Sequence, residues 1–237
     1  MPDIALSAGS GGSQNLSGYL VRPAGPGPWP GVVLIHEAFG LDPVMRRQAE
    51  HMAQIGYLTL APDLFSDGGA RRCVLGTFRS LLAQRGKPFV DIEAARQWLV
   101  DQPDCTGKVG VIGFCMGGAF VLVTAARGFD AASVNYGPLP RHIEQTLTGS
   151  CPMVASYGRK DITLRGAAGK IERTLTKLGV EHDVKEYASA GHSFLNDAMA
   201  GPRALQPLLK IGNLKPEPEA AKDAWNRIEA FFAEHLS

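Results

Sequence analysis

A cysteine flanked by glycines carries the clearest chemical signal in this sequence. Residues 113–118 are Gly-Phe-Cys-Met-Gly-Gly, directly after the apolar run 108–112 and before a helical stretch. The pattern Gly-x-nucleophile-x-Gly forms a tight turn from a strand to a helix, which exposes the nucleophile. At such a turn the Cys115 sulfur would face a helix N-terminus, whose partial positive charge favours thiolate. The alternative is a buried free cysteine in a glycine-rich turn, since cysteine is often buried.

A nucleophile at such a turn needs an acid and then a histidine further along the chain. Asp161 follows the apolar run 152–157, and His192 lies in a loop of small residues after the run 181–187. Each has a plainer interpretation: Asp161 as a turn residue or helix cap, and His192 as a solvated loop residue. Because parallel strands end at one edge of a sheet, we expect both side chains to lie near the cysteine.

These three residues together predict nucleophilic catalysis. His192 would take the thiol proton, Asp161 would orient the imidazole, and Cys115 would attack a carbonyl carbon. The backbone N–H of Met116, the residue after the nucleophile, is expected to hold the developing oxyanion. A second N–H is expected from the loop after an earlier strand, with Ala38 as the donor.

Strands and helices are predicted to alternate along most of the chain. The apolar runs are short and continuous, as in strands covered on both faces, and the helical stretches show apolar spacing of three to four residues. The predicted strands are 16–22, 31–36, 57–61, 108–112, 131–135, 152–157 and 181–187, and the predicted helices are about 43–55, 91–101, from about 116, 164–178 and 221–232. This alternation predicts an α/β fold with a mainly parallel sheet and helices on both faces.

The whole chain, residues 1–237, is predicted to form a single domain. A length of 237 residues suits one large domain or two small ones, and no internal repeat divides it. Asp42-Pro43 is typical of a helix start, and Gly56 of the residue just after a helix end. The proline-containing segment 201–218 is predicted to be a surface excursion or a flap.

Charge and composition argue against several classes of partner. The net charge is +1 without a basic stripe, which disfavours binding to nucleic acid or to an anionic membrane. No apolar run is long enough for a membrane span and no secretory signal is visible, so we expect a cytoplasmic protein. The four cysteines lack paired spacing, which suits a reducing compartment. His36-Glu37 begins a zinc motif, but Gly40 stands where the second histidine is needed, so neither a metal nor another cofactor is expected.

Four short segments together point to a family. They are Gly-Phe-Cys-Met-Gly-Gly at 113–118, His-Glu-Ala-Phe-Gly at 36–40, Ala-Pro-Asp-Leu at 61–64 and Gly-His-Ser-Phe at 191–194. In this combination the chain resembles the dienelactone hydrolases (carboxymethylenebutenolidases), an α/β-hydrolase family, from about Leu16 to Leu195 and more loosely to the C-terminal helix.

The resemblance implies a cysteine nucleophile acting on a lactone or ester, with Cys115, Asp161 and His192 matching the family triad. It also implies that Glu37 contacts the thiol and that this contact changes when substrate enters, so that thiolate forms on demand. The alternative for Glu37 is a surface carboxylate. Ser193, next to the triad histidine, is expected to bind substrate.

One departure from the family concerns the substrate carboxylate. Family members that open dienelactones bind it with two arginines, one of them four residues after the triad histidine, where this chain has Asn196. The other comes from the region before the helix at 91–101, which is short here. Its candidates are Arg71, Arg72 and Arg79, of which Arg79 is our prediction, and Arg203 is a further candidate.

We therefore expect a cysteine-dependent hydrolase that opens a small lactone or ester, in the breakdown of aromatic compounds. A general carboxylesterase or thioesterase of the same fold remains open, because such enzymes differ in pocket residues. A non-catalytic thiol-sensing protein on the same scaffold also remains open, since an activated thiol can be oxidised. A cysteine peptidase is less favoured, because the fold does not determine the acyl group. The sequence makes no prediction of oligomeric state.

Overall fold

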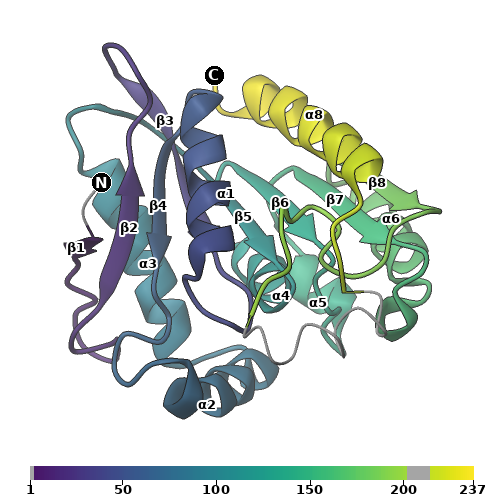
Figure 1. Ribbon diagram of the computed structural model, residues 1–237, viewed down its shortest axis with the longest axis horizontal. Helices are drawn as coiled ribbons and strands as arrows, with labels where there is room; N and C mark the ends of the chain where they lie inside the picture. The colour runs from purple at the N-terminus through teal and green to yellow at the C-terminus, as the bar shows by residue number, and fades with distance from the viewer. Residues whose placement is uncertain (1–2, 202–213) are drawn as a thin grey trace.

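Eight strands of the computed structural model form one sheet. The structure describes residues 3–201 and 214–237 (Figure 1). The strands are β1 (Asp3–Ala5), β2 (Ser17–Val21), β3 (Trp29–Ile35), β4 (Leu58–Pro62), β5 (Cys105–Phe114), β6 (Ala131–Asn135), β7 (Met153–Gly158) and β8 (His182–Tyr187). Their order is β1-β2-β4-β3-β5-β6-β7-β8. The pairs β1–β2 and β2–β4 are antiparallel and all others are parallel, which confirms the predicted, mainly parallel sheet.

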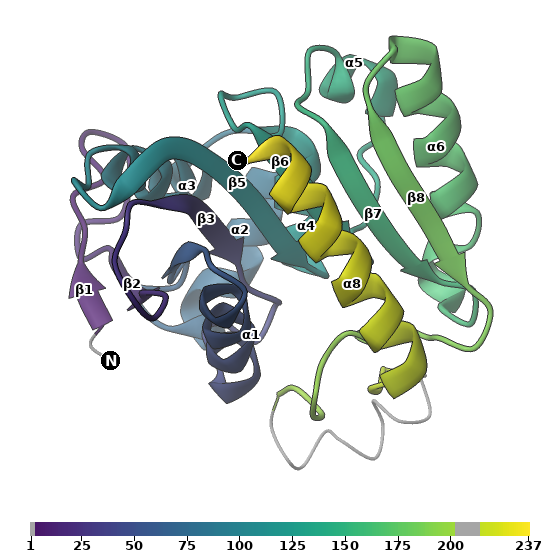
Figure 2. The same cartoon turned by 90° about the horizontal axis from the view of Figure 1, so that it is seen from above.

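Helices cover both faces of this sheet, as predicted. They are α1 (Pro43–Gln54), α2 (Ala70–Ala83), α3 (Lys87–Val100), α4 (Met116–Thr124), α5 (Ile143–Leu147), α6 (Ala167–Leu178) and α8 (Pro218–His235), with a short 3₁₀ helix η1 (Ile162–Leu164). Figure 2 shows α1 and α8 on one face and the other α-helices on the opposite face. Participation of both halves of the chain in one sheet supports the proposal of a single domain.

The central strands are largely apolar because they contribute to two cores, as β3 shows. In β3, Val33 and Ile35 pack on the face that carries α3 and α4. Val32 and Leu34, which alternate with them, pack on the face that carries α1 and α8. All four side chains are fully buried. This explains why the strand reads as a continuous apolar run rather than an alternating one.

Capping residues mark where the helices begin. Asp42 caps α1 as predicted, since its carboxylate accepts from the N–H groups of Val44 and Met45, each at 3.0 Å. The prediction of a helix from residue 164 was wrong by one turn. Asp161 caps the separate η1 helix instead, and Gly166, with φ of 72°, redirects the chain before α6 begins.

Four elements were not predicted: β1, α2, α5 and η1. β1, α5 and η1 are at most five residues long, and α2 packs on the core mainly through half-buried side chains. Most of the segment predicted as an excursion or flap, residues 202–213 of 201–218, lies outside the described residues. Within the described part of the chain, none of the helices has the length and apolar character needed to cross a bilayer.

Candidate active site

Cys115 lies at the turn between β5 and α4, where the sequence placed it. Its backbone has φ of 54° and ψ of −115°, a conformation that non-glycine residues rarely adopt. The turn is held because the Cys115 N–H donates to the Asn135 carbonyl at 3.0 Å, at the end of the neighbouring strand β6. A strained residue that its surroundings hold in place is typical of a functional site.

Two glycines allow this turn to pack against β3. A Cβ atom at Gly117 would lie 2.1 Å from the Ile35 carbonyl oxygen, and one at Gly113 would lie 2.3 Å from the Gly117 carbonyl oxygen. Only glycine fits at such distances. Because the turn rests on the end of β3, the residues that follow this strand, Glu37 and Ala38, are brought beside it.

Met116 and Ala38, the predicted oxyanion donors, therefore come from adjacent strand ends. Met116 is the first residue of α4, so its N–H has no acceptor within the helix. The macrodipole of α4 adds a partial positive charge at the same place. Ala38 lies three residues after the end of β3 and is half-buried.

Asp161 and His192 form a close, buried pair. His192 Nδ1 and Asp161 Oδ2 are 2.5 Å apart, and the Thr163 N–H and hydroxyl donate to the other carboxylate oxygen at 2.9 and 2.6 Å. Burial alone would raise the pKa of Asp161, but the hydrogen bonds from His192 and Thr163 outweigh it and lower this pKa. Asp161 is thus held as an anion that fixes the imidazole.

His192 is a strengthened base. Burial disfavours the imidazolium and would lower its pKa, but hydrogen bonds to Asp161 and Cys115, together with their negative charges, raise the pKa of His192 to about 10. The interaction with Cys115 places the thiol next to this imidazole. The structure therefore brings together the three residues that the sequence predicted as a triad.

Glu37 is buried beside these residues rather than exposed. Its Oε1 accepts from the Ser193 hydroxyl and from Asn196 Nδ2, both at 3.2 Å. Burial raises the pKa of Glu37, although the charge of His192 and the hydrogen bonds from Asn196 and Ser193 partly oppose it. The interpretation of Glu37 as a surface carboxylate is excluded, since its exposed fraction is 3%.

Tyr136 belongs to the same site and was missed by the sequence analysis. It follows β6, has φ of 43°, and donates from its hydroxyl to Asn196 Oδ1 at 3.2 Å. Its ring centroid lies 5.0 Å from that of His192. Burial, and then the charges of Glu37 and Cys115, raise the pKa of Tyr136 well above its ordinary value. Its place directly after a predicted strand, like that of Cys115, was the signal that could have revealed it.

His36 has a structural role rather than a catalytic one. Its Nε2 accepts from the Leu64 N–H at 3.1 Å, so Nδ1 carries the proton and donates to the Glu37 carbonyl at 2.7 Å. Burial lowers the pKa of His36, which keeps it neutral. This fixes the backbone of the loop that carries Glu37.

The other cysteines are poorer candidates for the nucleophile. All four are free. Burial raises the pKa of Cys151 to about 12 and also raises that of Cys105. Both thiols are therefore held in the unreactive protonated form.

None of the predicted arginines contacts the triad in the described part of the chain. Arg71, Arg72 and Arg79 are exposed on α2, and Arg203 lies outside the described residues. Asn196, which stands where the resemblance places an arginine, is 2% exposed and bonded to both Glu37 and Tyr136. The described neighbourhood of Glu37 therefore contains an amide in place of a cation.

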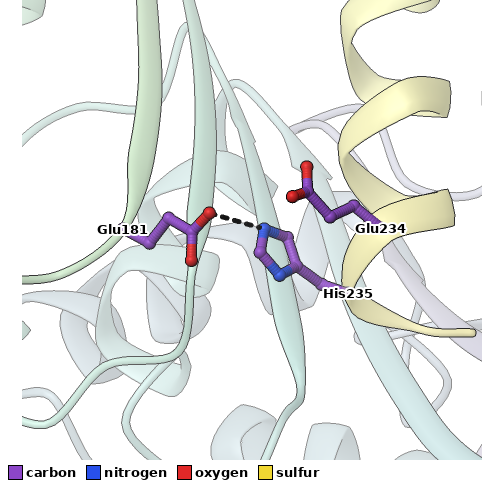
Figure 3. Close-up of side chains that lie close together, drawn as sticks. All are labelled: Glu181, Glu234 and His235. Carbon is purple, nitrogen blue, oxygen red and sulfur yellow. Dashed lines mark ion pairs between the residues drawn. The ribbon is translucent and has the colours of Figure 1, made fainter.

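One group of possible metal ligands among the described residues includes none of the triad residues. Glu181, Glu234 and His235 bring one ligand atom each to within 4.8 Å of one another, where the start of β8 meets the end of α8 (Figure 3). Both glutamates are exposed, and His235 Nε2 lies 3.7 Å from Glu181 Oε1. An ion pair between these two side chains accounts for the arrangement without a metal. Sequence spacing could not reveal the group, because its members lie at opposite ends of different elements.

Comparisons with known proteins agree with this geometry. A sequence model of the Dienelactone hydrolase family matches residues 16–236. The chain belongs to this family. It is accordingly a hydrolase of ester or lactone bonds with the α/β-hydrolase fold. The family assignment confirms the resemblance stated from the four motifs.

Individual relatives of the dienelactone hydrolase family align over most of the chain. The chain is 28% identical to a carboxymethylenebutenolidase of Rhodococcus opacus, over 92% of this chain and 86% of that protein. It is 29% identical to a carboxymethylenebutenolidase of Pseudomonas sp. strain P51, over 80% and 83%. A solved dienelactone hydrolase from Anabaena variabilis superposes with a TM-score of 0.72 at 23% identity, over 100% of this chain and 99% of that chain. At that identity the superposition shows the shared fold.

Proposed function

We propose that this protein hydrolyses a small ester or lactone through an acyl-enzyme on Cys115. The observation that carries the proposal is the strained turn at Cys115, with φ of 54°, beside the buried His192–Asp161 pair. The nucleophile Cys115 is then next to the base His192, and His192 is hydrogen-bonded to Asp161, which orients it. Acyl transfer requires this arrangement.

The proposed reaction has two steps. His192 takes the proton from the Cys115 sulfur, and the sulfur forms a bond to the substrate carbonyl carbon. The carbon–oxygen bond to the leaving alcohol breaks, and the alcohol oxygen receives the proton from His192. Water then attacks the thioester with His192 as base, which releases the carboxylic acid and restores the thiol. The N–H groups of Met116 and Ala38 stabilise the oxyanion in both steps.

Glu37 is proposed to control when the thiolate forms. It lies buried beside His192 and Tyr136, both of which also interact with Cys115, and burial favours its neutral form. A carboxyl that is neutral in the resting site and ionises only when its contacts change would affect the thiol in the way that the family resemblance implies. Ser193 and Asn196 both donate to Glu37 Oε1. Ser193 is proposed to lie next to bound substrate.

A neutral substrate is the second candidate, and Asn196 favours it. An anionic lactone needs a cation to offset its carboxylate, whereas Asn196 is uncharged and already bonded on both sides. Glu37 nearby would also repel an anion when ionised. General carboxylesterase activity is therefore the specific alternative to dienelactone hydrolysis.

The test is to measure initial rates of the wild type and Cys115→Ala on a dienelactone and on a neutral aryl ester. We expect turnover by the wild type, loss of turnover in Cys115→Ala, and an acyl adduct on the Cys115 peptide by mass spectrometry. Cys73→Ala, a half-buried cysteine on α2, is the matched control and should retain activity. Full activity of a folded Cys115→Ala protein would disprove the nucleophile assignment.

The same experiment separates the remaining alternatives. The ratio of rates on the two substrates distinguishes an anionic lactone from a neutral ester. Absence of turnover on both, together with ready oxidation of Cys115 to a sulfenic acid, would favour a thiol sensor. A cytoplasmic location and a place in the breakdown of aromatic compounds are part of the proposal, the former supported by four unpaired cysteines.

A further inference from the structure

A cavity lies on the face of the molecule that carries α2, α4 and α5. Its volume is about 910 Å³, within the range of about 300–1,000 Å³ that small-molecule sites have. It is bounded by the C-terminal part of α2, the outer side of α4 with the turn after it, and residues 138–148. Cys115, Asp161, His192 and Glu37 do not line it. We call this cavity the α2–α5 groove.

The charged side chains that line the groove are the guanidinium groups of Arg127 and Arg141. No carboxylate lines it among the described residues. Arg127 and Arg141 form no ion pair in the described part of the chain. Glu144, on α5, faces elsewhere and pairs with Lys177 Nζ at 2.6 Å. Two guanidinium groups without an acid in one groove favour an anionic occupant.

One end of the groove is held rigid by hydrogen bonds. Gln84 Nε2 donates to Thr146 Oγ1 at 3.1 Å, which joins the end of α2 to α5. Arg127 donates to the Gln84 carbonyl at 3.0 Å, and its guanidinium lies 4.6 Å from the centroid of the Phe89 ring. Gln84 has φ of 53°, so its backbone is strained and fixed by these contacts. The cation is therefore preorganised rather than loose at the surface.

The rest of the lining is aliphatic. Ala119 and Val123, one turn apart on α4, form part of one wall, and Leu81, Leu82 and Leu139 line the groove as well. Leu82 is 84% exposed, which leaves a large apolar side chain in water. An occupant that covered this side chain would therefore be favoured by burial of apolar surface.

We propose that the α2–α5 groove binds a small aliphatic carboxylate. The carboxylate would bind the free donors of Arg127 and Arg141, and the hydrocarbon chain would lie along α4 against Leu82 and Leu139. This site is distinct from the triad and does not depend on the proposed hydrolase mechanism. It is close to the triad through α4, since the Ala119 N–H donates to the Cys115 carbonyl at 3.2 Å.

Titration calorimetry of the full chain with decanoate tests the proposal. We expect saturable binding of one decanoate, weakened about three- to tenfold by Arg141→Gln and by Leu82→Asp. Both side chains are exposed, so neither change threatens folding. Leu75→Asp, on the same helix but outside the groove, and Arg173→Gln, an exposed arginine on α6, are the matched controls and should bind like the wild type. Decyltrimethylammonium, with the same chain and the opposite charge, should bind more weakly.

Several results would overturn this proposal. They are absence of decanoate binding to the wild type, equal affinity of Leu82→Asp and Leu75→Asp, and equal affinity for the ammonium compound. Binding that disappears in Cys115→Ala but persists in Leu82→Asp would place the ligand at the triad instead. Binding that persists in Cys115→Ala and weakens in both groove variants supports a separate site.

Discussion

Asn196 donates a hydrogen bond from Nδ2 to Glu37 Oε1 at 3.2 Å, deep in the site and without a charge of its own. Its Oδ1 simultaneously accepts from the Tyr136 hydroxyl, so one amide joins an acid and a phenol that follow different strands. The family resemblance places an arginine at this position. The amide keeps Glu37 in place without a positive charge. Burial raises the pKa of this carboxyl, and the hydrogen bond from Asn196 opposes that effect only in part.

Replacing this amide by a hydrocarbon should destabilise the fold. Leucine has a similar size but cannot form hydrogen bonds, so Asn196→Leu removes one of the two donors to Glu37 and the acceptor of the Tyr136 hydroxyl, while the Ser193 hydroxyl still donates to Glu37. We expect the free energy of unfolding in urea to fall by about 1–3 kcal/mol. Asn226→Leu, an exposed asparagine on α8, is the control and should change stability little. Equal stability of Asn196→Leu and the wild type would show that the linkage contributes nothing.

The identity of the triad acid can be tested against two other aspartates. Asp161→Asn should lower kcat by on the order of 10⁴-fold, because an asparagine cannot hold the productive tautomer of His192. Asp183 and Asp197 are paired instead with Arg227 at 2.7 Å and Arg47 at 2.5 Å. Asp183→Asn and Asp197→Asn should therefore keep near-normal rates in the same ester assay. A larger loss in either of them than in Asp161→Asn would transfer the assignment to that residue.

The sequence was informative where function depends on position along strands. Cys115, Asp161 and His192 were identified because each follows its own strand, and parallel strands bring such residues to one edge. The hydrogen bond between Asn196 and Tyr136 was not predicted, since it depends on how a loop turns back over the sheet. The helix α2 was missed because the exposed Leu75 and Leu82 interrupt the apolar pattern, although Ala70, Cys73, Val74, Phe78 and Leu81 pack on the core at helical spacing.

The pKa of His192 should depend on the cysteine. Burial lowers the pKa of His192, but hydrogen bonds to Asp161 and to Cys115, with the charges of both groups, raise it to about 10. In Cys115→Ala the contribution of the cysteine is absent, so the pKa of His192 should fall. Titration of the imidazole resonances by NMR measures this shift, with Cys73→Ala as the control. An unchanged His192 titration in Cys115→Ala would mean that thiol and imidazole do not interact.

Glu37 should lower stability at neutral pH. Burial raises its pKa, so the folded protein binds this proton more tightly than the unfolded chain does. That favours folding below the ordinary carboxyl pKa, and the benefit is lost as pH rises through the raised pKa. Glu37→Gln keeps both hydrogen-bond acceptor contacts without a charge. The Tm of Glu37→Gln should exceed that of the wild type at neutral pH, because the variant buries no charge. Each kcal/mol gained in this way should raise the Tm by about 2–4 °C, and the difference in Tm should disappear at acidic pH. A constant difference across pH would contradict this account.

Gly117 should tolerate no side chain, because the nucleophile turn rests on the backbone of β3. A Cβ atom there would lie 2.1 Å from the Ile35 carbonyl oxygen, a backbone atom that cannot rotate aside. We expect Gly117→Ala to lose about 3 kcal/mol of unfolding free energy, the upper end of the usual cost of overpacking, and to lose hydrolase activity as Cys115 is displaced.

Gly76 lies in the middle of α2, and a Cβ atom added there would have no other atom within 4 Å. Gly76→Ala should therefore gain about 0.5–1 kcal/mol from helix propensity and keep full activity. Urea unfolding and ester hydrolysis on the two variants measure both effects. If Gly117→Ala proved as stable and active as Gly76→Ala, the contact between the turn and β3 would not determine the position of the nucleophile.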